Sequence, residues 1–506
     1  MNGGRMRLLY SLAAIACVGA LLLGSGVLRG REGKEPGAEA TMRQLPVRPP
    51  RGAGSFYPAE EKELAALVDE LMARGNRLDL PHVHGVLVPH AGYVYSGPVA
   101  ASAIRELPRE IERVFILAAN HNGNADFSGV SVPEVSGYAV PGSVVPLSPL
   151  VDVLRRDSLF TTVPAVHTGY MIEVELPFLL ARMGKRKKPQ FSIVPMIAGR
   201  LDASQVNHLA EVLHRYADEK TAFVFSVDLS HFYPDATARR LDAATIDAIL
   251  SRDLERLSRA TTDGNQVLMT MVTLAGLGGW DATLLRYANS GDASGDRQRV
   301  VGYAGIAFHE PVRFTREQER LLLDLARRSI AAYLETGKRM EVDREAIRGH
   351  ALLGIPRGVF VTLKKKGRLR GCIGDLVSDR PLYEGVAHFA VEAAVHDPRF
   401  TPVTREELSG LDISISVLEY PRRLKVDDPA RYPALLTPGR DGVILLHKGR
   451  RSTYLPQVWE ELPDPVQFLS RLCMKQGAEP DCWQRPETGV FRYSAYEFGE
   501  REKKDS

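Results

Sequence analysis

Residues 83–97 read VHGVLVPHAGYVYSG, and this stretch decides the fold of the first half of the chain. Its apolar run, 83–88, is typical of a buried strand, and a turn rich in Pro, His and Gly follows directly. Similar apolar runs recur at 114–118, 192–197 and 222–227, and amphipathic helical stretches lie between the runs, at 60–74, 204–216 and 239–257. Because strands that alternate with helices form parallel sheets, the sequence predicts an α/β domain with a mainly parallel central sheet.

The composition narrows the function classes. The chain has 506 residues, of which 44% are hydrophobic and 25% charged, as in folded globular proteins. Its formal net charge is only +3, whereas dedicated nucleic-acid binders usually carry a large basic excess, so we expect no nucleic-acid partner. The 4 cysteines include no CxxC pair, which argues against a four-cysteine zinc site or an iron–sulfur cluster.

The N-terminus carries an uncharged apolar run over residues 8–28, preceded by Arg5 and Arg7. A run of this length can cross a ~30 Å hydrocarbon core as a helix, so residues 1–28 are predicted to be a signal anchor or a signal peptide. Residues 29–50 contain Gly, Pro and charged residues without an apolar period, which is typical of a flexible linker. We therefore expect a membrane-anchored or exported protein whose body is extracytoplasmic.

Three histidines follow the predicted strands. His90 comes after the run 83–88, His121 after 114–118, and His231 after 222–227. Ligands of open α/β sheets bind at the carboxyl ends of the strands, so these loops are expected to form one site.

Imidazoles at such an edge suit a divalent transition metal, which accepts two neutral histidines and one anionic ligand and keeps positions open for substrate. His90 and His121 form the best imidazole pair. Spacing alone leaves three candidates for the carboxylate: Asp228, Asp263 and Glu173.

The motifs of this half are PHAGYVYSG (89–97), the Asn120-His121 turn, IEVELPFL (172–179) and SVDLSHFY (226–233). Together they resemble the Memo family, which is similar in fold to the LigB-type class III extradiol dioxygenases. The resemblance covers about residues 51–310. It implies a metal site at His90, His121 and a third position where Memo proteins usually have Cys before Gly, and where this chain has Asp263.

The carboxylate at position 263 changes the expected metal. Two histidines and one carboxylate are the facial set of non-haem Fe(II) oxygenases, so the predicted cofactor is Fe(II), with Cu or Zn as alternatives. The competing interpretation is that Asp263 merely caps a helix that begins near Gln266.

The resemblance also implies catalytic residues. His231, with Asp228 three residues before it, matches the proton-transfer histidine of the dioxygenases, and a carboxylate can fix its tautomer. Where the family usually has His-Ser, this chain has Tyr170-Met171, so a histidine is missing unless His167 replaces it.

The second half begins with a helix that Thr315 and Gln318 should cap and Gly337 should end. Its motifs are LRGCIG (369–374), HDPRFTPV (396–403), ISISVLEYP (413–421) and YLPQVW (454–459). They resemble the AMMECR domain over residues 315–498, which implies an α+β fold. Memo-like and AMMECR-like proteins are components B and A of the AmmeMemoRadiSam system, so the resemblance also implies a radical-SAM protein as a partner.

Each cysteine of this half allows two interpretations: Cys372 is either reactive or structural, and Cys473 and Cys482 are either paired or unpaired. Cys372 is a candidate catalytic thiol whose pKa Arg370 would lower if the side chains met, or else a small buried residue. Cys473 and Cys482 flank a Gly/Pro turn and could pair in an oxidising compartment.

The sequence thus predicts a membrane-tethered metal-dependent oxidoreductase of the extradiol dioxygenase type that acts on a small aromatic diol, fused to an AMMECR domain. In this prediction Fe(II) is held by His90, His121 and Asp263, and His231 is the base. The alternatives are a non-catalytic metal-binding or protein-interaction module, and a hydrolase that uses metal-bound water.

Overall fold

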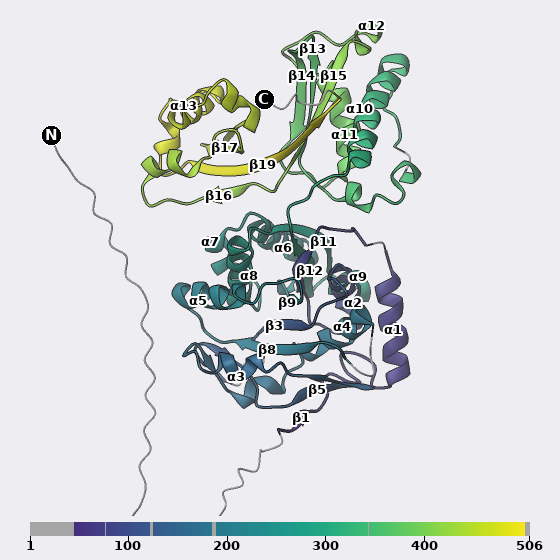
Figure 1. Cartoon of the computed structure of the whole chain (residues 1–506), viewed down its shortest axis with the longest axis vertical. Helices are drawn as coiled ribbons and strands as arrows, with labels where there is room; N and C mark the ends of the chain where they lie inside the picture. The colour runs from purple at the N-terminus through teal and green to yellow at the C-terminus, as the bar shows by residue number, and fades with distance from the viewer. Residues whose placement is uncertain (1–44, 76, 122–124, 185–188, 343, 501–506) are drawn as a thin grey trace, which may run out of the picture. The chain divides into compact units, whose positions relative to one another are not determined.

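The computed structural model describes residues 45–75, 77–121, 125–184, 189–342 and 344–500 (Figure 1). The predicted leader, residues 8–28, lies outside this range. The described part of the predicted linker is not all loop, because Val47–Arg48 form strand β1, which pairs with β5 (Gly137–Val140). Arg48 is buried there and its guanidinium contacts the carboxylate of Glu173, so the folded domain begins earlier than residue 51.

The first half is built on a mixed sheet of nine strands. Its centre consists of four neighbouring parallel strands, in the order β2 (Val83–Val88), β9 (Thr221–Ser226), β3 (Arg113–Ala119) and β8 (Ser192–Ala198). Antiparallel strands extend one edge: β12 (Val300–His309), β11 (Asp281–Asn289) and the short β10 (His231–Tyr233). At the other edge lie β4 (Val130–Ser131) and β7 (Phe160–Thr161). The predicted parallel centre is present, and antiparallel strands flank it.

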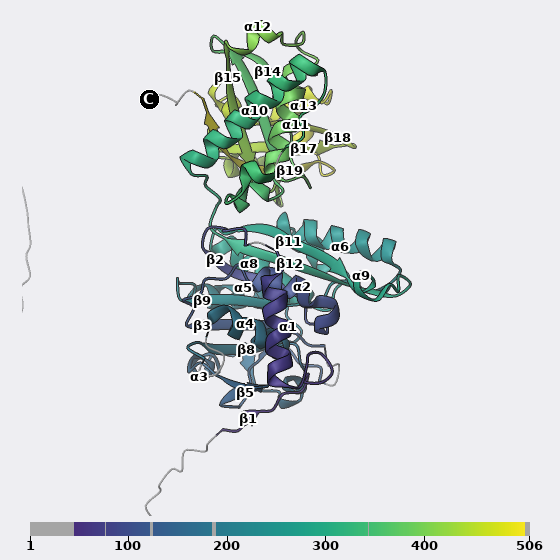
Figure 2. The ribbon, with the colours of Figure 1, turned by 90° about the vertical axis from the view of Figure 1, so that its right-hand side faces the viewer.

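Helices cover both faces of this sheet (Figures 1 and 2). On one face lie α1 (Glu61–Ala73), α2 (Tyr93–Ile104) and α4 (Leu176–Met183); on the other lie α5 (Ala203–His214) and α8 (Asn265–Leu277). Alternate residues of each strand supply the two cores: Ile116 packs with the first group of helices, and Phe115 and Leu117 with the second. A central strand with both faces buried needs the continuous apolar run seen in the sequence.

The second half is an α+β unit whose seven-stranded sheet is antiparallel throughout. Its strands are β13 (Val359–Lys365), β14 (Arg368–Asp375), β15 (Leu411–Leu418), β16 (Arg422–Leu424), β17 (Asp441–His447), β18 (Arg450–Tyr454) and β19 (Gly489–Gly499). Its main helices are α10 (Arg316–Thr336), α11 (Leu382–Val395) and α13 (Pro465–Lys475). The expected caps of α10 are confirmed, since Thr315 and Gln318 form a reciprocal capping box and Gly337 ends the helix in a left-handed conformation.

Cys473 and Cys482 form a disulfide bond between the end of α13 and the following turn. Of the two interpretations that the sequence left open for these residues, pairing is the one that the structure contains.

The predicted localisation requires a correction. Within residues 45–500, apart from the short gaps given above, no helix is both long enough and apolar enough to span a bilayer. The helix α10 has 21 residues, but charged side chains such as Arg320, Asp324 and Arg328 lie along its length. Within the described residues this finding corrects the prediction of a membrane-anchored chain; the predicted leader, residues 8–28, lies outside them.

Candidate metal centre

His90 lies two residues beyond the last residue of β2, Val88, and is 1% exposed. Its backbone N–H donates to Asp228 Oδ1 at 2.8 Å, which ties the loop after β2 to the loop after β9. On the side chain, Nδ1 lies 3.0 Å from Ser226 Oγ, and that hydroxyl donates to the carbonyl of Met171. Because the serine proton is used in this way, His90 Nδ1 is the donor and its Nε2 keeps a lone pair for another partner.

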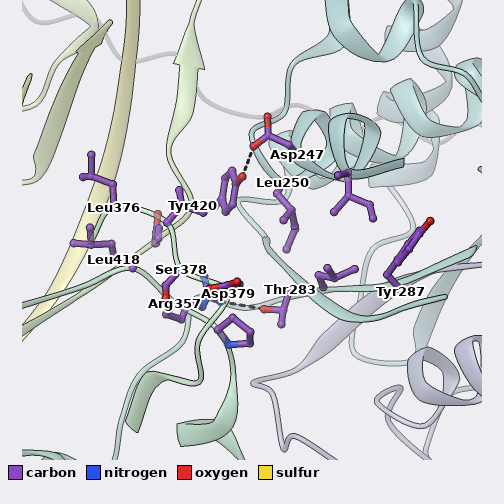
Figure 3. A pocket seen from close by; sticks show the side chains of 18 of the residues that line it. Asp247, Leu250, Thr283, Tyr287, Arg357, Leu376, Ser378, Asp379, Leu418 and Tyr420 are labelled. Carbon is purple, nitrogen blue, oxygen red and sulfur yellow. Dashed lines mark hydrogen bonds between the residues drawn. The ribbon is translucent and has the colours of Figure 1, made fainter. Parts of the chain in front are cut away.

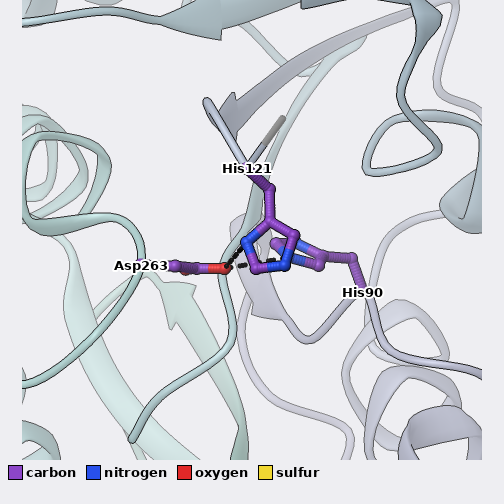
Figure 4. A group of neighbouring side chains, drawn as sticks. All are labelled: His90, His121 and Asp263. Carbon is purple, nitrogen blue, oxygen red and sulfur yellow. Dashed lines mark ion pairs between the residues drawn. The ribbon is translucent and has the colours of Figure 1, made fainter. Parts of the chain in front are cut away.

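Nε2 of His90 faces Asp263, and His121 approaches the same carboxylate from the loop after β3 (Figure 4). Asp263 Oδ2 lies 3.0 Å from His90 Nε2 and 3.3 Å from His121 Nδ1. One ligand atom from each residue lies within 4.8 Å of the others. The structure therefore brings together the three residues that the resemblance implied.

The atoms of this group fit a metal ion. His90 Nε2 and both carboxylate oxygens of Asp263 are buried and make no hydrogen bond of regular geometry among the described residues, although Nε2 and Oδ2 face each other as an ion pair at 3.0 Å. Buried polar atoms without partners are costly, so their convergence calls for a cation between them. Two ligands ~2.1 Å from one ion and at right angles to each other are ~3 Å apart, close to the two distances measured here. The group can therefore hold a divalent metal, whose identity the donors alone do not fix.

The electrostatics also favour positive charge at this point. Burial by itself would lower the pKa of His90, but Asp228 and Asp263 outweigh it and raise the pKa to about 9. Burial would raise the pKa of Asp263, yet the neighbouring His90 and His121 lower it to about 2. Without a metal ion, these shifts describe a proton held between His90 and Asp263, and a bound metal cation would replace that proton.

Asp263 is not a helix cap. The helix α8 begins at Asn265, its N-cap residue is Gly264, and no side chain caps it. Gly264 allows the close approach that places Asp263, because a Cβ at this position would lie 2.7 Å from Val227 and 3.3 Å from Ala119. The capping interpretation of Asp263 is therefore wrong.

His231 lies beside the three ligands, with its ring centre 5.7 Å from that of His121. Its Nδ1 donates to the carbonyl of Leu229 at 2.8 Å, so a neutral His231 carries its free lone pair on Nε2. The sequence led us to expect that Asp228 orients the ring of His231. In the structure the carbonyl of Leu229 does so, and Asp228 binds the backbone N–H of His90 instead.

The sequence model of the Memo-like protein family matches residues 48–307, just over half of the chain. The chain belongs to the Memo-like family. The AMMECR1 family matches residues 323–498, so both domains occur in one polypeptide.

Two relatives with similar sequences are MEMO1 family proteins. A MEMO1 family protein of Methanosarcina acetivorans is 35% identical over 52% of this chain and 99% of the relative, and one of Archaeoglobus fulgidus is 32% identical over 52% and 99%. Among solved structures, an uncharacterized protein of Pyrococcus horikoshii (PH0010) is 37% identical, covers 37% of this chain and 94% of its own, and has a TM-score of 0.35.

Within the Memo-like domain, the structure adds residues that the sequence did not single out as part of the site. Tyr170 places its ring centre 6.2 Å from that of His90 and 6.4 Å from that of His121, and stacks on Phe56. Behind His90, Oε1 of the buried Glu175 lies 3.2 Å from Ser226 Oγ, and burial raises the pKa of Glu175 to about 8. Tyr170 stands where the Memo family usually has a histidine. This difference from the family was the one feature of the sequence that pointed to Tyr170.

His167 and Glu173, which the sequence offered as candidates, are not part of the metal site. His167 does not replace the missing histidine, because its ring contacts Ser131 and Tyr138 and burial lowers its pKa to about 3. The carboxylate of Glu173 is bound by Arg48 and by the hydroxyl of Tyr57, which fasten the start of the domain. Of the three carboxylate candidates, only Asp263 faces both imidazoles.

Cys372 of the AMMECR1 domain lies on β14, and Thr362 Oγ1 is 3.3 Å from its sulfur. Arg370, expected to activate it, is instead paired with Glu407 at 3.0 Å. Burial is the largest influence on the thiol and raises the pKa of Cys372. The condition under which Arg370 would lower that pKa is therefore not met.

Proposed function

We propose that the Memo-like domain is a metal-dependent oxidoreductase of the extradiol dioxygenase type, with Fe(II) held by His90, His121 and Asp263. The observation that carries this proposal is the convergence of three ligand residues at the carboxyl edge of the parallel strands, with buried ligand atoms of His90 and Asp263 that lack a regular hydrogen bond. Two imidazoles and one carboxylate are the ligands typical of non-haem Fe(II) oxygenases, and they leave positions open for substrate. Bound Fe(II) would supply the redox chemistry that O₂ activation requires.

The residues around the ligands suit an aromatic diol. His231 can accept a proton at Nε2, since its Nδ1 is committed to the carbonyl of Leu229. Its role would be to remove a proton from a substrate hydroxyl.

Tyr170 and Phe56 offer an aromatic wall beside the ligands, against which a flat ring can stack. Burial, with Asp228 and Asp263 nearby, raises the pKa of Tyr170 to about 12, so its hydroxyl stays protonated and can donate a hydrogen bond.

The test is a metal analysis of protein purified without oxygen, followed by O₂ uptake with a panel of catechols. We expect stoichiometric Fe(II) and O₂ uptake with at least one catechol, and neither in His90→Ala. Metal binding without O₂ uptake would contradict the oxidoreductase proposal and favour a metal-binding module. Metal-dependent hydrolysis without O₂ uptake would favour a hydrolase.

A further inference from the structure

A cavity of about 500 Å³ lies between the Memo-like and AMMECR1 domains, which belong to one compact unit (Figure 3). Its walls come from α6 (Asp235–Leu250), from β11, and from the loops 356–358, 376–379 and 418–420. The lining is mostly apolar and includes Ala243, Ile246, Leu250, Leu284, Leu376 and Leu418. Ligand sites are often found at domain boundaries and have this size and character.

Among the charged residues that line this cavity, Arg357 is the buried one, with 7% of its surface exposed. Its Nη2 donates to Thr283 Oγ1 at 3.1 Å, but its Nε is buried without a hydrogen-bond partner among the described residues. Asp281 and Glu419 are close enough to favour its charge, yet Asp281 is already paired with Arg422 at 2.9 Å. A buried guanidinium with an unused donor is costly unless a further acceptor reaches it.

Of the other charged groups that line the cavity, Asp379 is exposed, and Asp247 and Arg239 are already engaged. Asp247 accepts hydrogen bonds from the hydroxyl of Tyr420 and from Arg256, as Figure 3 shows for Tyr420. Arg239 is paired with Asp235 at 3.0 Å. An occupant therefore meets Arg357 as the one buried group in this lining with a donor to spare among the described residues.

A second cavity of about 470 Å³ is also lined by Arg357 and by Glu419. Three further arginines line it, Arg313, Arg422 and Arg440, together with Asp281, which is paired with Arg422, so arginines outnumber carboxylates four to two. The guanidinium of Arg357 thus lies where an apolar space meets a region rich in positive charge, which favours an occupant that is apolar at one end and anionic at the other.

We propose that this interdomain cavity binds a small amphipathic anion, with its apolar body among the aliphatic side chains and its carboxylate or comparable anionic head on Arg357. The head would supply the acceptor that Nε lacks, as a charge-assisted hydrogen bond. The body would remove apolar side chains from water, which predicts about fourfold tighter binding for each added CH₂ until the cavity is full.

Calorimetric titration of the full chain tests the proposal with three probes: octanoate, 1-octanol, which has the same chain without the charge, and acetate, which has the charge without the chain. We expect octanoate to bind at least tenfold more tightly than 1-octanol, and acetate not to bind measurably. Equal affinity for octanoate and 1-octanol, or no binding of octanoate, would overturn the proposal.

Variants locate the binding. Arg357→Gln should weaken octanoate binding at least tenfold and leave 1-octanol within about threefold, while Ala243→Trp, at an exposed lining position, should weaken both. The matched control Arg368→Gln, an exposed arginine outside the lining, should change neither. Unchanged octanoate binding in Arg357→Gln would refute the assignment of the head.

Two further variants test whether the result has another cause, either a loss of stability or binding at the metal centre. If Arg357→Gln melts at a clearly lower temperature, Arg357→Lys keeps the charge and should retain octanoate selectivity over 1-octanol; loss of selectivity there would refute the role of the charge. Asp263→Asn should bind octanoate like the wild type, which separates this proposal from that of the metal centre. Weakened octanoate binding in Asp263→Asn would place the ligand at the metal centre instead.

Discussion

At Asp263, one carboxylate faces two imidazoles and supplies the only anionic donor of the three-residue group. Two neutral histidines leave the charge of a divalent ion uncompensated, so the chemistry of the third side chain decides which ion binds best. His231, beside these three residues, is the candidate for proton transfer to or from a substrate.

For Asp263 we predict that Asp263→Asn, which keeps the shape and loses the charge, binds Fe(II) more than tenfold more weakly. Asp263→Cys should shift preference towards Cu or Zn, because a thiolate is a softer ligand, and should lower O₂-dependent activity. Metal titration of the three proteins under nitrogen checks both expectations. An unchanged Fe(II) affinity in Asp263→Asn would remove Asp263 from the ligand set.

For His231 we predict that His231→Ala lowers turnover by roughly a hundredfold or more while metal content stays near that of the wild type. His121→Ala is the matched comparison, since its loss should empty the site. Steady-state kinetics and metal analysis of both variants separate a base from a ligand. Loss of metal from His231→Ala would show that His231 is a ligand.

The buried His309 predicts a pH dependence of stability. Burial, with Arg357 nearby, lowers its pKa to about 3, against about 6.5 in the unfolded chain. The folded state thus favours the neutral ring, so this stability is present above pH 6.5 and is lost as the pH falls from 6.5 towards 3. Between pH 7 and pH 5 the wild type should lose about 2 kcal/mol more unfolding free energy than His309→Asn. Urea unfolding at both pH values measures the difference, and the exposed His214→Asn should behave like the wild type.

At the scale of elements, the site depends on how closely the start of α8 approaches β3 and the residue after β9. Gly264→Ala should lower the unfolding free energy by about 1–3 kcal/mol and weaken metal binding, because its Cβ would collide with Val227. Gly276→Ala in the same helix is the control: its Cβ would meet only Arg252, at 4.0 Å, so metal binding should not change. Thermal melting and metal titration check the pair, and equal effects would argue against a positioning role for Gly264.

Several parts of this arrangement could be predicted from sequence. Apolar runs bounded by turns identified the central strands, and parallel strands necessarily bring the histidines after them to one edge. The choice of Asp263 over Asp228 needed the family resemblance, since spacing does not say which carboxylate faces inward. Tyr170 and Glu175 could not be assigned, because they lie in or next to short 3₁₀ turns whose placement depends on tertiary packing.

At the scale of the whole molecule, contacts between the domains are ionic as well as apolar. Arg422 of β16 lies 2.9 Å from Asp281 of β11, and their side chains are 25% and 5% exposed. We predict that Arg422→Ala lowers the unfolding free energy by about 2 kcal/mol, less than the loss of a fully buried pair because Arg422 is partly solvated. Urea unfolding measures this, with the exposed Arg440→Ala, expected to change it by less than about 0.5 kcal/mol, as the control. Equal losses in both variants would contradict the contact.

The proposed ligands His90, His121 and Asp263 come from three loops that are far apart in the chain and meet only when the Memo-like domain is folded. An ion that binds the folded state alone shifts the folding equilibrium by mass action, by about 2.7 kcal/mol at a hundredfold excess over its dissociation constant. With the proposed Fe(II) as that ion, the supply of iron would influence the lifetime of the protein. Chains made during iron shortage would open more often to proteases, and their abundance would fall without any change in transcription.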